Sequence, residues 1–344
     1  MVSNGIKPLC LFNEIQSHDE KLLLRLCHYM EIIMSSCSLC LLFWQIPWSH
    51  IKGRKRVPIH INFAILLCSG FILYFLHIFF MLVTGVFIEV TSFIEPECVF
   101  TMITWQCHIL RLPVFCAIIG FSLLHLFLFL ERCLATVYLR TYANSGRKLG
   151  IAATFIIWSI AIAWNAYIVH DDDLLEYKAY CLQTTPNNGS RMLQMLSALL
   201  FIDLCTTFGD IILRIVNNRQ KKRKNVDYSL RKSYQISENE TTTRVILTLS
   251  LVHSLTFTSY LLATVIARAS FGGAGTALYT TIIEYVHLMI TLYLVSTLCI
   301  AFYLKRSIRR HKVVQVTSAR DQTDVYFAQL NQQLSRNIPA NTKR

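Results

Sequence analysis

Seven long apolar segments dominate this sequence and restrict what it can fold into. Each is close to or longer than the roughly 20 residues that an α-helix needs to cross the hydrocarbon core of a bilayer. Only 15% of the residues are charged, against roughly 25% in soluble domains. The predicted fold class is therefore all-α, a multi-pass membrane protein with a bundle of seven transmembrane helices. The segments cover approximately residues 26–46, 59–83, 100–130, 149–169, 192–216, 245–267 and 278–304.

The distribution of basic residues predicts the orientation of this bundle. Of the 33 Lys and Arg residues, 26 lie on the side of the segments that follow spans one, three, five and seven, counting Arg214 in the last turn of span five, and six lie on the opposite side. Cytoplasmic segments carry the excess of Lys and Arg in membrane proteins. We therefore expect an extracellular amino terminus over 1–25, a seven-transmembrane domain over 26–304 and a cytoplasmic tail over 305–344. The net charge of +13 then reflects topology and attraction to anionic membrane lipid, and it requires no nucleic-acid partner.

Acidic residues and one glycosylation motif agree with this orientation. The second predicted outer loop contains Asp171, Asp172 and Asp173, and it ends near the sequence Asn188-Gly-Ser. An Asn-x-Ser/Thr triplet accepts a glycan only on the lumenal side, so we expect glycosylation at Asn188. The triplet that begins at Asn239 lies on the predicted cytoplasmic side and should stay unmodified.

One cysteine in the same outer loop is a candidate for a disulfide bond. Disulfides form on the oxidising side of the membrane, where Cys181 lies between spans four and five. A bond from Cys181 to the outer end of span three would hold this loop across the mouth of the bundle. Both Cys98 and Cys107 are positioned to form it.

An acidic and a basic residue stand together at the predicted inner end of span three. Glu131-Arg132 has the simple interpretation of an interfacial pair with snorkelling side chains. It also resembles the Asp/Glu-Arg switch of rhodopsin-like receptors, and Arg132 follows Cys107 by the 25 residues that separate the disulfide cysteine from the switch arginine in that class. The resemblance favours Cys107 over Cys98 as the partner of Cys181. The chain departs from the class because span six has no proline and span seven has no Asn-Pro pair.

A second resemblance covers scattered positions between about residues 60 and 290. The sequence Leu230-Arg-Lys-Ser-Tyr-Gln-Ile-Ser-Glu-Asn239 is similar to a signature of the nematode serpentine chemoreceptors of the Sra superfamily, classes alpha-beta and alpha in particular. It departs from the signature at Ser229 and Lys232, where the Ser and Arg positions of the signature are shifted by one residue. Elsewhere, Ala143 follows Tyr142 where the family usually has an acid. Further matching positions are Cys98, Cys107, Leu110, Arg111, Gly120, Glu131, Arg132, Ala135, Thr136, Tyr142, Tyr180 and Cys181.

This resemblance implies a chemosensory receptor in the plasma membrane of a sensory neuron. Its expected partners are a small external ligand and a heterotrimeric G protein. The residues that the resemblance assigns to G-protein coupling are Glu131, Arg132, Tyr234, Gln235, Glu238 and Asn239. Two rival functions are a ligand-gated channel with inverted topology and a transporter, although the chain has no internal repeat.

Ionisable side chains within the predicted spans are candidates for function, because burying charge in a bilayer is costly. Arg111 in span three and Glu284 in span seven lie at similar estimated depths, with His108 and His287 on the same turns. These four residues form the predicted ligand site. An ion pair that only braces two helices is the alternative, and the two roles are compatible.

The histidines in the spans raise the question of metal-dependent catalysis. Such sites need clustered His and Asp ligands at helical spacing. No two of the histidines buried in helices are three or four residues apart; these are His77, His125, His253 and His287. We therefore expect no metal site, no cofactor and no enzymatic activity. Asp210 lies one turn before Arg214, which predicts an ion pair within span five.

Overall fold

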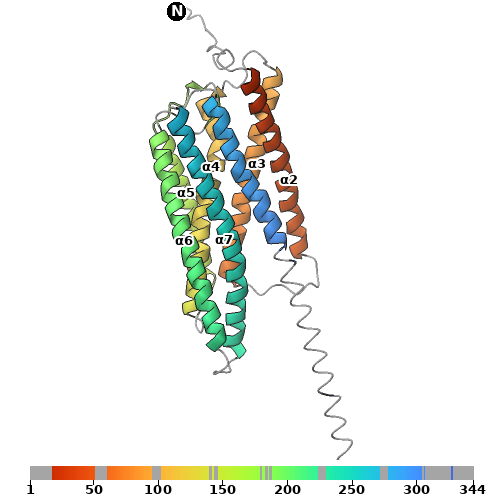
Figure 1. The fold of residues 1–344 in the computed structure, drawn as a ribbon, viewed down its shortest axis with the longest axis vertical. Coiled ribbons are helices and arrows are strands. Elements are labelled where there is room, and N and C mark those ends of the chain that lie inside the picture. Colours follow the sequence, from red (N-terminus) through yellow and green to blue (C-terminus); the bar gives the residue numbers. More distant parts are fainter. Residues whose placement is uncertain are drawn as a thin grey trace, which may run out of the picture. The chain divides into compact units, whose positions relative to one another are not determined.

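The computed structural model describes seven long helices and one two-stranded sheet. It describes residues 18–50, 60–94, 102–138, 142, 146–178, 180–182, 185, 188–223, 230–271, 278–303, 306 and 327. The helices are α2 (His18–His50), α3 (Ile61–Ile94), α4 (Thr104–Val137), α5 (Lys148–Val169), α6 (Gly189–Arg223), α7 (Leu230–Phe271) and a final helix, Leu278–Tyr303, that we call the seventh span (Figure 1). The strands are β1 (Met102–Ile103) and β2 (Tyr177–Lys178).

All seven helices are long and apolar enough to cross a membrane. The prediction of an all-α bundle of seven transmembrane helices is therefore confirmed. The chain divides into two compact units, Met1–Cys299 and Ile300–Arg344. Every contact described below lies within the first unit. In the second, the structure describes only residues 300–303, 306 and 327.

Several helices extend well beyond the apolar segments that predict them. α4 continues to Val137, seven residues past the predicted end at residue 130, and α7 begins at Leu230 although its apolar segment begins near 245. Backbone hydrogen bonds within a helix do not depend on apolar side chains, so a helix can continue into the headgroup region and the water beyond. Glu131 and Arg132 therefore lie inside α4 and not at its end.

α4 occupies the centre of the bundle. Of its apolar window, 61% of the residues are buried, against 28 to 44% in the other six spans. It packs against α3, α5, α6 and α7. Gly120 permits one of these contacts, because a Cβ atom there would lie 2.6 Å from Leu73 in α3.

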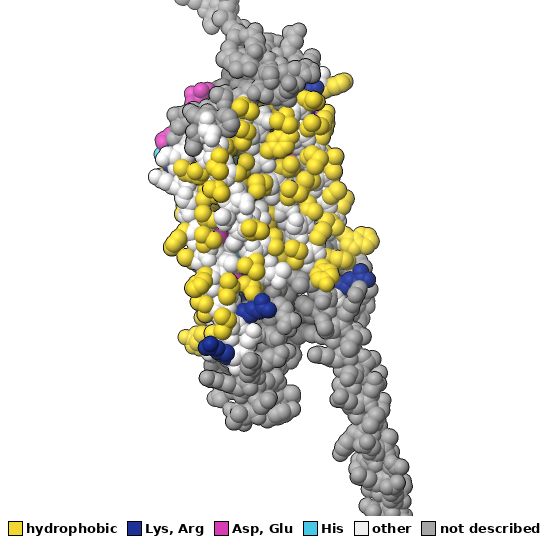
Figure 2. Space-filling view, viewed as in Figure 1, with side chains coloured by type: hydrophobic (Ala, Val, Ile, Leu, Met, Phe, Trp, Pro, Cys, Tyr) yellow, Lys and Arg dark blue, Asp and Glu magenta, His cyan; other side chains and the backbone are white. Residues whose placement is uncertain are grey.

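The remaining helices expose large apolar side chains to their surroundings. Examples are Phe155 in α5, Phe201 in α6 and Leu255 in α7, which are each at least 70% exposed. In Figure 2 such side chains cover the middle of the visible face, with Lys and Arg side chains near the lower end of α6. A continuous apolar surface of this size is typical of a protein that faces lipid.

Candidate functional site

A disulfide and a short sheet hold the loop between α5 and α6 against the start of α4. Cys107 in α4 is bonded to Cys181, with Cα atoms 5.3 Å apart. β1 pairs antiparallel with β2, with Met102 opposite Lys178. The alternative partner, Cys98, lies outside the described residues. Residues 180–182 are therefore fixed directly beside the first turn of α4.

Arg111 and Glu284 meet in the interior one turn below this disulfide. The Arg111 Nη2 atom donates to Glu284 Oε1 at 2.6 Å, and the two side chains are 2% and 0% exposed. Arg111 Nη1 also contacts the Met81 sulfur at 3.8 Å. The Arg111 Nε and Glu284 Oε2 atoms have no hydrogen-bond partner among the described residues. The pair links α4 to the seventh span and keeps some of its hydrogen-bonding capacity unused.

The loop residue Tyr180 extends this polar group toward α2. Its hydroxyl lies 2.8 Å from His28 Nε2, and burial together with the nearby Glu284 carboxylate raises the pKa of Tyr180 well above its ordinary value. Glu31, one turn after His28 on α2, is also buried. We call Arg111, Glu284, Tyr180, His28 and Glu31 the Arg111 cluster.

Sequence analysis missed three members of this cluster. Glu31 lies within the predicted span 26–46, so the criterion that identifies Arg111 also applies to it. Tyr180 lies in a loop and stood out only as a position that matches the family resemblance, and His28 lies at the start of the predicted span 26–46, where a polar side chain is unremarkable.

An apolar pocket adjoins the Arg111 cluster. It is small, with about 10 Å³ open to the centre of a water-sized molecule, and is lined by Phe115, Tyr260 and His287 with aliphatic side chains of α6. Phe115 lies one turn beyond Arg111 on α4, and His287 lies three residues beyond Glu284. The aromatic ring centroids of Phe115 and His287 are 5.6 Å apart. Ligand pockets in proteins commonly combine such apolar walls with a few polar groups.

His108, the fourth residue of the predicted ligand site, lies on a different side of the cluster. Its Nε2 atom is 3.4 Å from Asp172 Oδ2 in the loop between α5 and α6. Thus the structure pairs Arg111 with Glu284 close to the pocket, places His287 in the pocket wall and directs His108 toward the loop.

A second polar group, the Arg132 cluster, lies near the other end of α4. Arg132 is 1% exposed and donates through Nε and Nη2 to the two carboxylate oxygens of Glu131, and its guanidinium lies 4.7 Å from the ring centroid of Phe63 in α3. Tyr142 donates from its hydroxyl to Glu131. Burial and this carboxylate raise the pKa of Tyr142. The cluster comprises Glu131, Arg132, Phe63 and Tyr142, and it holds Arg132 away from solvent.

The remaining residues assigned to coupling lie in the first turns of α7. Tyr234, Gln235, Glu238 and Asn239 belong to the helix, but their side chains lie outside the described residues. Their proposed role rests on the resemblance of the sequence alone.

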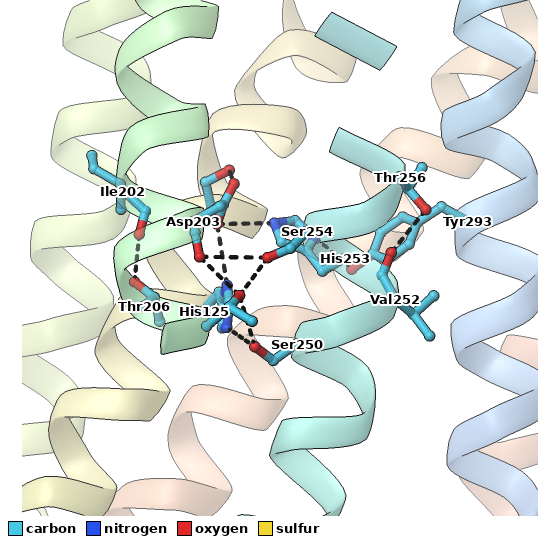
Figure 3. Close-up of polar contacts among 12 residues, drawn as sticks. His125, Ile202, Asp203, Thr206, Ser250, Val252, His253, Ser254, Thr256 and Tyr293 are labelled. Carbon is cyan, nitrogen blue, oxygen red and sulfur yellow. Dashed lines mark hydrogen bonds and ion pairs between the residues drawn. The ribbon is translucent and has the colours of Figure 1, made fainter. Parts of the chain in front are cut away.

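A third polar group lies between the other two, and its members were not expected to meet. His125 of α4 contacts Asp203 and Asp210 of α6 through Nδ1 and Nε2 at 3.1 and 3.3 Å. His253 of α7 approaches Asp203 Oδ1 through Nε2, also at 3.1 Å. Figure 3 shows these side chains converging from three helices. We call His125, Asp203, His253 and Asp210 the His125 cluster.

The spacing of histidines along a helix does not reveal this group, because its members lie on α4, α6 and α7. The ion pair expected between Asp210 and Arg214 is replaced by the contact to His125. A histidine that meets aspartates on a neighbouring helix leaves no periodic signal in the sequence.

The structure gives Asn188 a role that does not fit glycosylation. Its side chain is 0% exposed, its Oδ1 accepts from the backbone N–H of Thr185 at 2.8 Å, and its Nδ2 donates to Asp172 at 3.1 Å. A glycan on Nδ2 would displace the bond to Asp172. Asn188 therefore stabilises the turn before α6, and the sequence-based prediction of a glycan there is disfavoured.

Comparison with known protein families identifies a match over most of the chain. The sequence model of a protein family described as serpentine type 7TM GPCR receptor class ab chemoreceptor matches residues 11–335. No curated protein matches the chain.

Proposed function

Because this chain belongs to the serpentine seven-transmembrane class ab chemoreceptor family, we propose that it binds an external small molecule and activates a heterotrimeric G protein. Family membership and seven apolar helices make it a multi-pass membrane protein of the chemosensory, G-protein-coupled receptor type. The proposal adds the binding site, the coupling site and the location, which we take to be the plasma membrane of a sensory neuron.

The observation that carries the proposal is the buried pair of Arg111 and Glu284 beside an apolar pocket. The ion pair is 2.6 Å long, and each partner keeps one polar atom without a hydrogen bond among the described residues. A ligand with a polar group and a compact apolar body matches these features. His287 and Phe115 would contact the apolar body, and Tyr180 would cover the site from the loop.

The arrangement of α4 supports transmission from this site to the opposite end of the bundle. Arg111 and Arg132 are 21 positions apart on one helix, which is about 31 Å along its axis. A ligand that separates Arg111 from Glu284 favours a different packing of α4 against the seventh span, because it binds the two arrangements with different affinity. Movement of α7, the sixth span, would then free Arg132 from Glu131 for contact with a Gα subunit. Tyr234, Gln235, Glu238 and Asn239 at the start of α7 would join that contact.

The topology that this mechanism requires has the amino terminus outside and the tail in the cytosol. It is supported by the 26 basic residues on one side against six on the other. Because Asn188 is buried, the test uses a new sequon in the exposed loop, made by Leu174→Asn with Glu176→Thr. We expect a glycosidase-sensitive mass shift in this variant and none from the natural sequon at Asn239. A shift in the wild type that Asn239→Gln removes would invert the topology and favour the channel.

Purified protein in lipid nanodiscs tests binding and coupling separately. A panel of small organic acids, amines and amphiphiles is screened for compounds that raise the unfolding temperature, and each is then tested for nucleotide exchange on a heterotrimeric G protein. We expect Arg111→Met to lose both responses and Arg132→Ala to lose only the exchange.

Arg147→Ala, at an exposed arginine, is the matched control for Arg132→Ala and should retain both responses. Binding without any exchange in the wild type, or full exchange in Arg132→Ala, would contradict the coupling role. A panel in which no compound stabilises the wild type more than it stabilises Arg111→Met would contradict the ligand site.

A further inference from the structure

We propose that His125, Asp203 and His253 form a binding site for a divalent transition-metal ion, with Zn²⁺ as the natural occupant. The site joins α4, α6 and α7 in the interior of the bundle, between the Arg111 and Arg132 clusters. It does not depend on the proposed ligand or on G-protein coupling.

The three ligand atoms already lie close to the geometry that zinc requires. One atom from each residue lies within 4.8 Å of the others, and each histidine nitrogen is 3.1 Å from Asp203 Oδ1. Zinc binds histidine nitrogen and carboxylate oxygen at about 2.0 to 2.2 Å, which places tetrahedral ligands about 3.3 Å apart. Small side-chain rotations therefore suffice to place an ion between them.

Both imidazole rings are oriented by partners on their far sides. His253 Nδ1 lies 3.0 Å from the Tyr293 hydroxyl, and His125 Nε2 lies 2.7 Å from Ser250 Oγ (Figure 3). When each far nitrogen carries the proton and donates it to its hydroxyl partner, the nearer nitrogen keeps a free lone pair, as at histidine metal sites. In addition, the nearer nitrogen of His253 is buried without a well-directed hydrogen bond among the described residues.

The carboxylates match the charge of a divalent ion. Ser122 donates to Asp203 Oδ2 at 2.7 Å, which leaves Oδ1 for the ion. Asp210 is 1% exposed, and its Oδ1 has no hydrogen-bond partner among the described residues. Two buried carboxylates are costly without a counter-charge, and a divalent cation supplies it.

The donor set also selects the kind of metal. Imidazole nitrogen is a preferred ligand of zinc, copper, iron and nickel, whereas calcium, magnesium and manganese prefer oxygen ligands. With two nitrogens and one carboxylate oxygen, the site is built for the first group. The fourth position of a tetrahedral ion is open to water.

Absorption spectroscopy with Co²⁺ tests the site on the full chain in nanodiscs. After treatment with a chelator, wild-type protein is titrated with Co²⁺ and then with Zn²⁺ as competitor. We expect one Co²⁺ per chain with the visible absorption of a four-coordinate ion, and displacement by Zn²⁺. Absence of binding by wild-type protein up to millimolar Co²⁺ overturns the proposal without recourse to any variant.

Variants then assign the ligands. His253→Ala and Asp203→Asn should each weaken Co²⁺ binding at least tenfold, whereas His77→Ala, at a buried histidine of α3 outside the site, should leave it unchanged. His253→Cys should retain binding and add a sulfur-to-cobalt charge-transfer band. That band distinguishes a metal ligand from a hydrogen-bonding residue, because it arises only when the cysteine sulfur is bonded directly to cobalt. Equal affinity in wild type, His253→Ala and Asp203→Asn would refute the assignment.

Discussion

Replacing one member of the Arg111–Glu284 pair should lower the free energy of unfolding more than replacing both. The two side chains are 2% and 0% exposed and 2.6 Å apart, so each single substitution leaves a buried charge without its partner. Charges about 4 Å apart at an effective dielectric constant of about 20 attract by about 4 kcal/mol, and measured losses for such single changes are about 3 to 5 kcal/mol. We therefore expect Arg111→Met and Glu284→Leu each to lower the free energy of unfolding by about that amount.

The double variant should recover most of this loss. Replacing a buried ion pair with apolar residues of similar size is often neutral or stabilising, so Arg111→Met with Glu284→Leu should unfold within about 1 kcal/mol of wild type. The assay is equilibrium unfolding in mixed micelles with an increasing fraction of denaturing detergent. Glu31→Gln, at a buried carboxyl whose Oε1 has no hydrogen-bond partner among the described residues, is the matched control and should not lower stability. Additive losses in the double variant would refute the reasoning, because independent sites add.

Three further predictions concern packing, charge and the disulfide. Gly150→Ala should lower the free energy of unfolding by about 1 to 3 kcal/mol, since the new Cβ would lie 2.9 Å from the Asn62 backbone, whereas Gly146→Ala meets nothing within 4 Å and should be neutral in the same unfolding assay. Burial lowers the pKa of Lys178 in the folded protein, so the protonated side chain destabilises the fold below this lowered pKa, and the destabilisation disappears as the pH rises to the unfolded pKa of about 10.5. Lys178→Met should therefore raise the unfolding temperature at pH 7 and give no increase near pH 10.5. An increase that is the same at both pH values would contradict this reasoning. Cys181→Ser removes the disulfide and should reduce the rise in unfolding temperature on ligand binding more than it lowers the unfolding temperature of the free protein. A reductant should have the same effect on wild-type protein and no further effect on the variant.

The number and approximate positions of the helices were predictable, because the cost of exposing apolar residues acts on each segment independently. The helix ends were not, since a helix such as α7 continues through polar residues once it has begun. Arg111 and Glu284 could be paired from the sequence because each is expensive in a bilayer and their depths are similar. The His125 cluster could not, because the side chains that meet depend on the rotation of α4, α6 and α7 about their axes, which packing decides.

Some sequence-based expectations depend on more than packing. The coupling motif from Tyr234 to Asn239 and the orientation of the chain remain predictions, and the sequon and reconstitution experiments above address them. Asn188 shows why a short motif is weak evidence of modification: its three residues say nothing about whether the side chain is buried and hydrogen-bonded in a turn.

One helix supplies a residue to each of the three polar clusters. Arg111, His125 and Glu131 with Arg132 all belong to α4, and their partners belong to the seventh span, to α6 and α7, and to the segment around Tyr142. A sliding of α4 along its axis by one residue, about 1.5 Å, would lengthen or shorten contacts in all three clusters together. The axial position of α4 would then determine the state of the whole bundle, and a metal ion bound at His125 would oppose this shift.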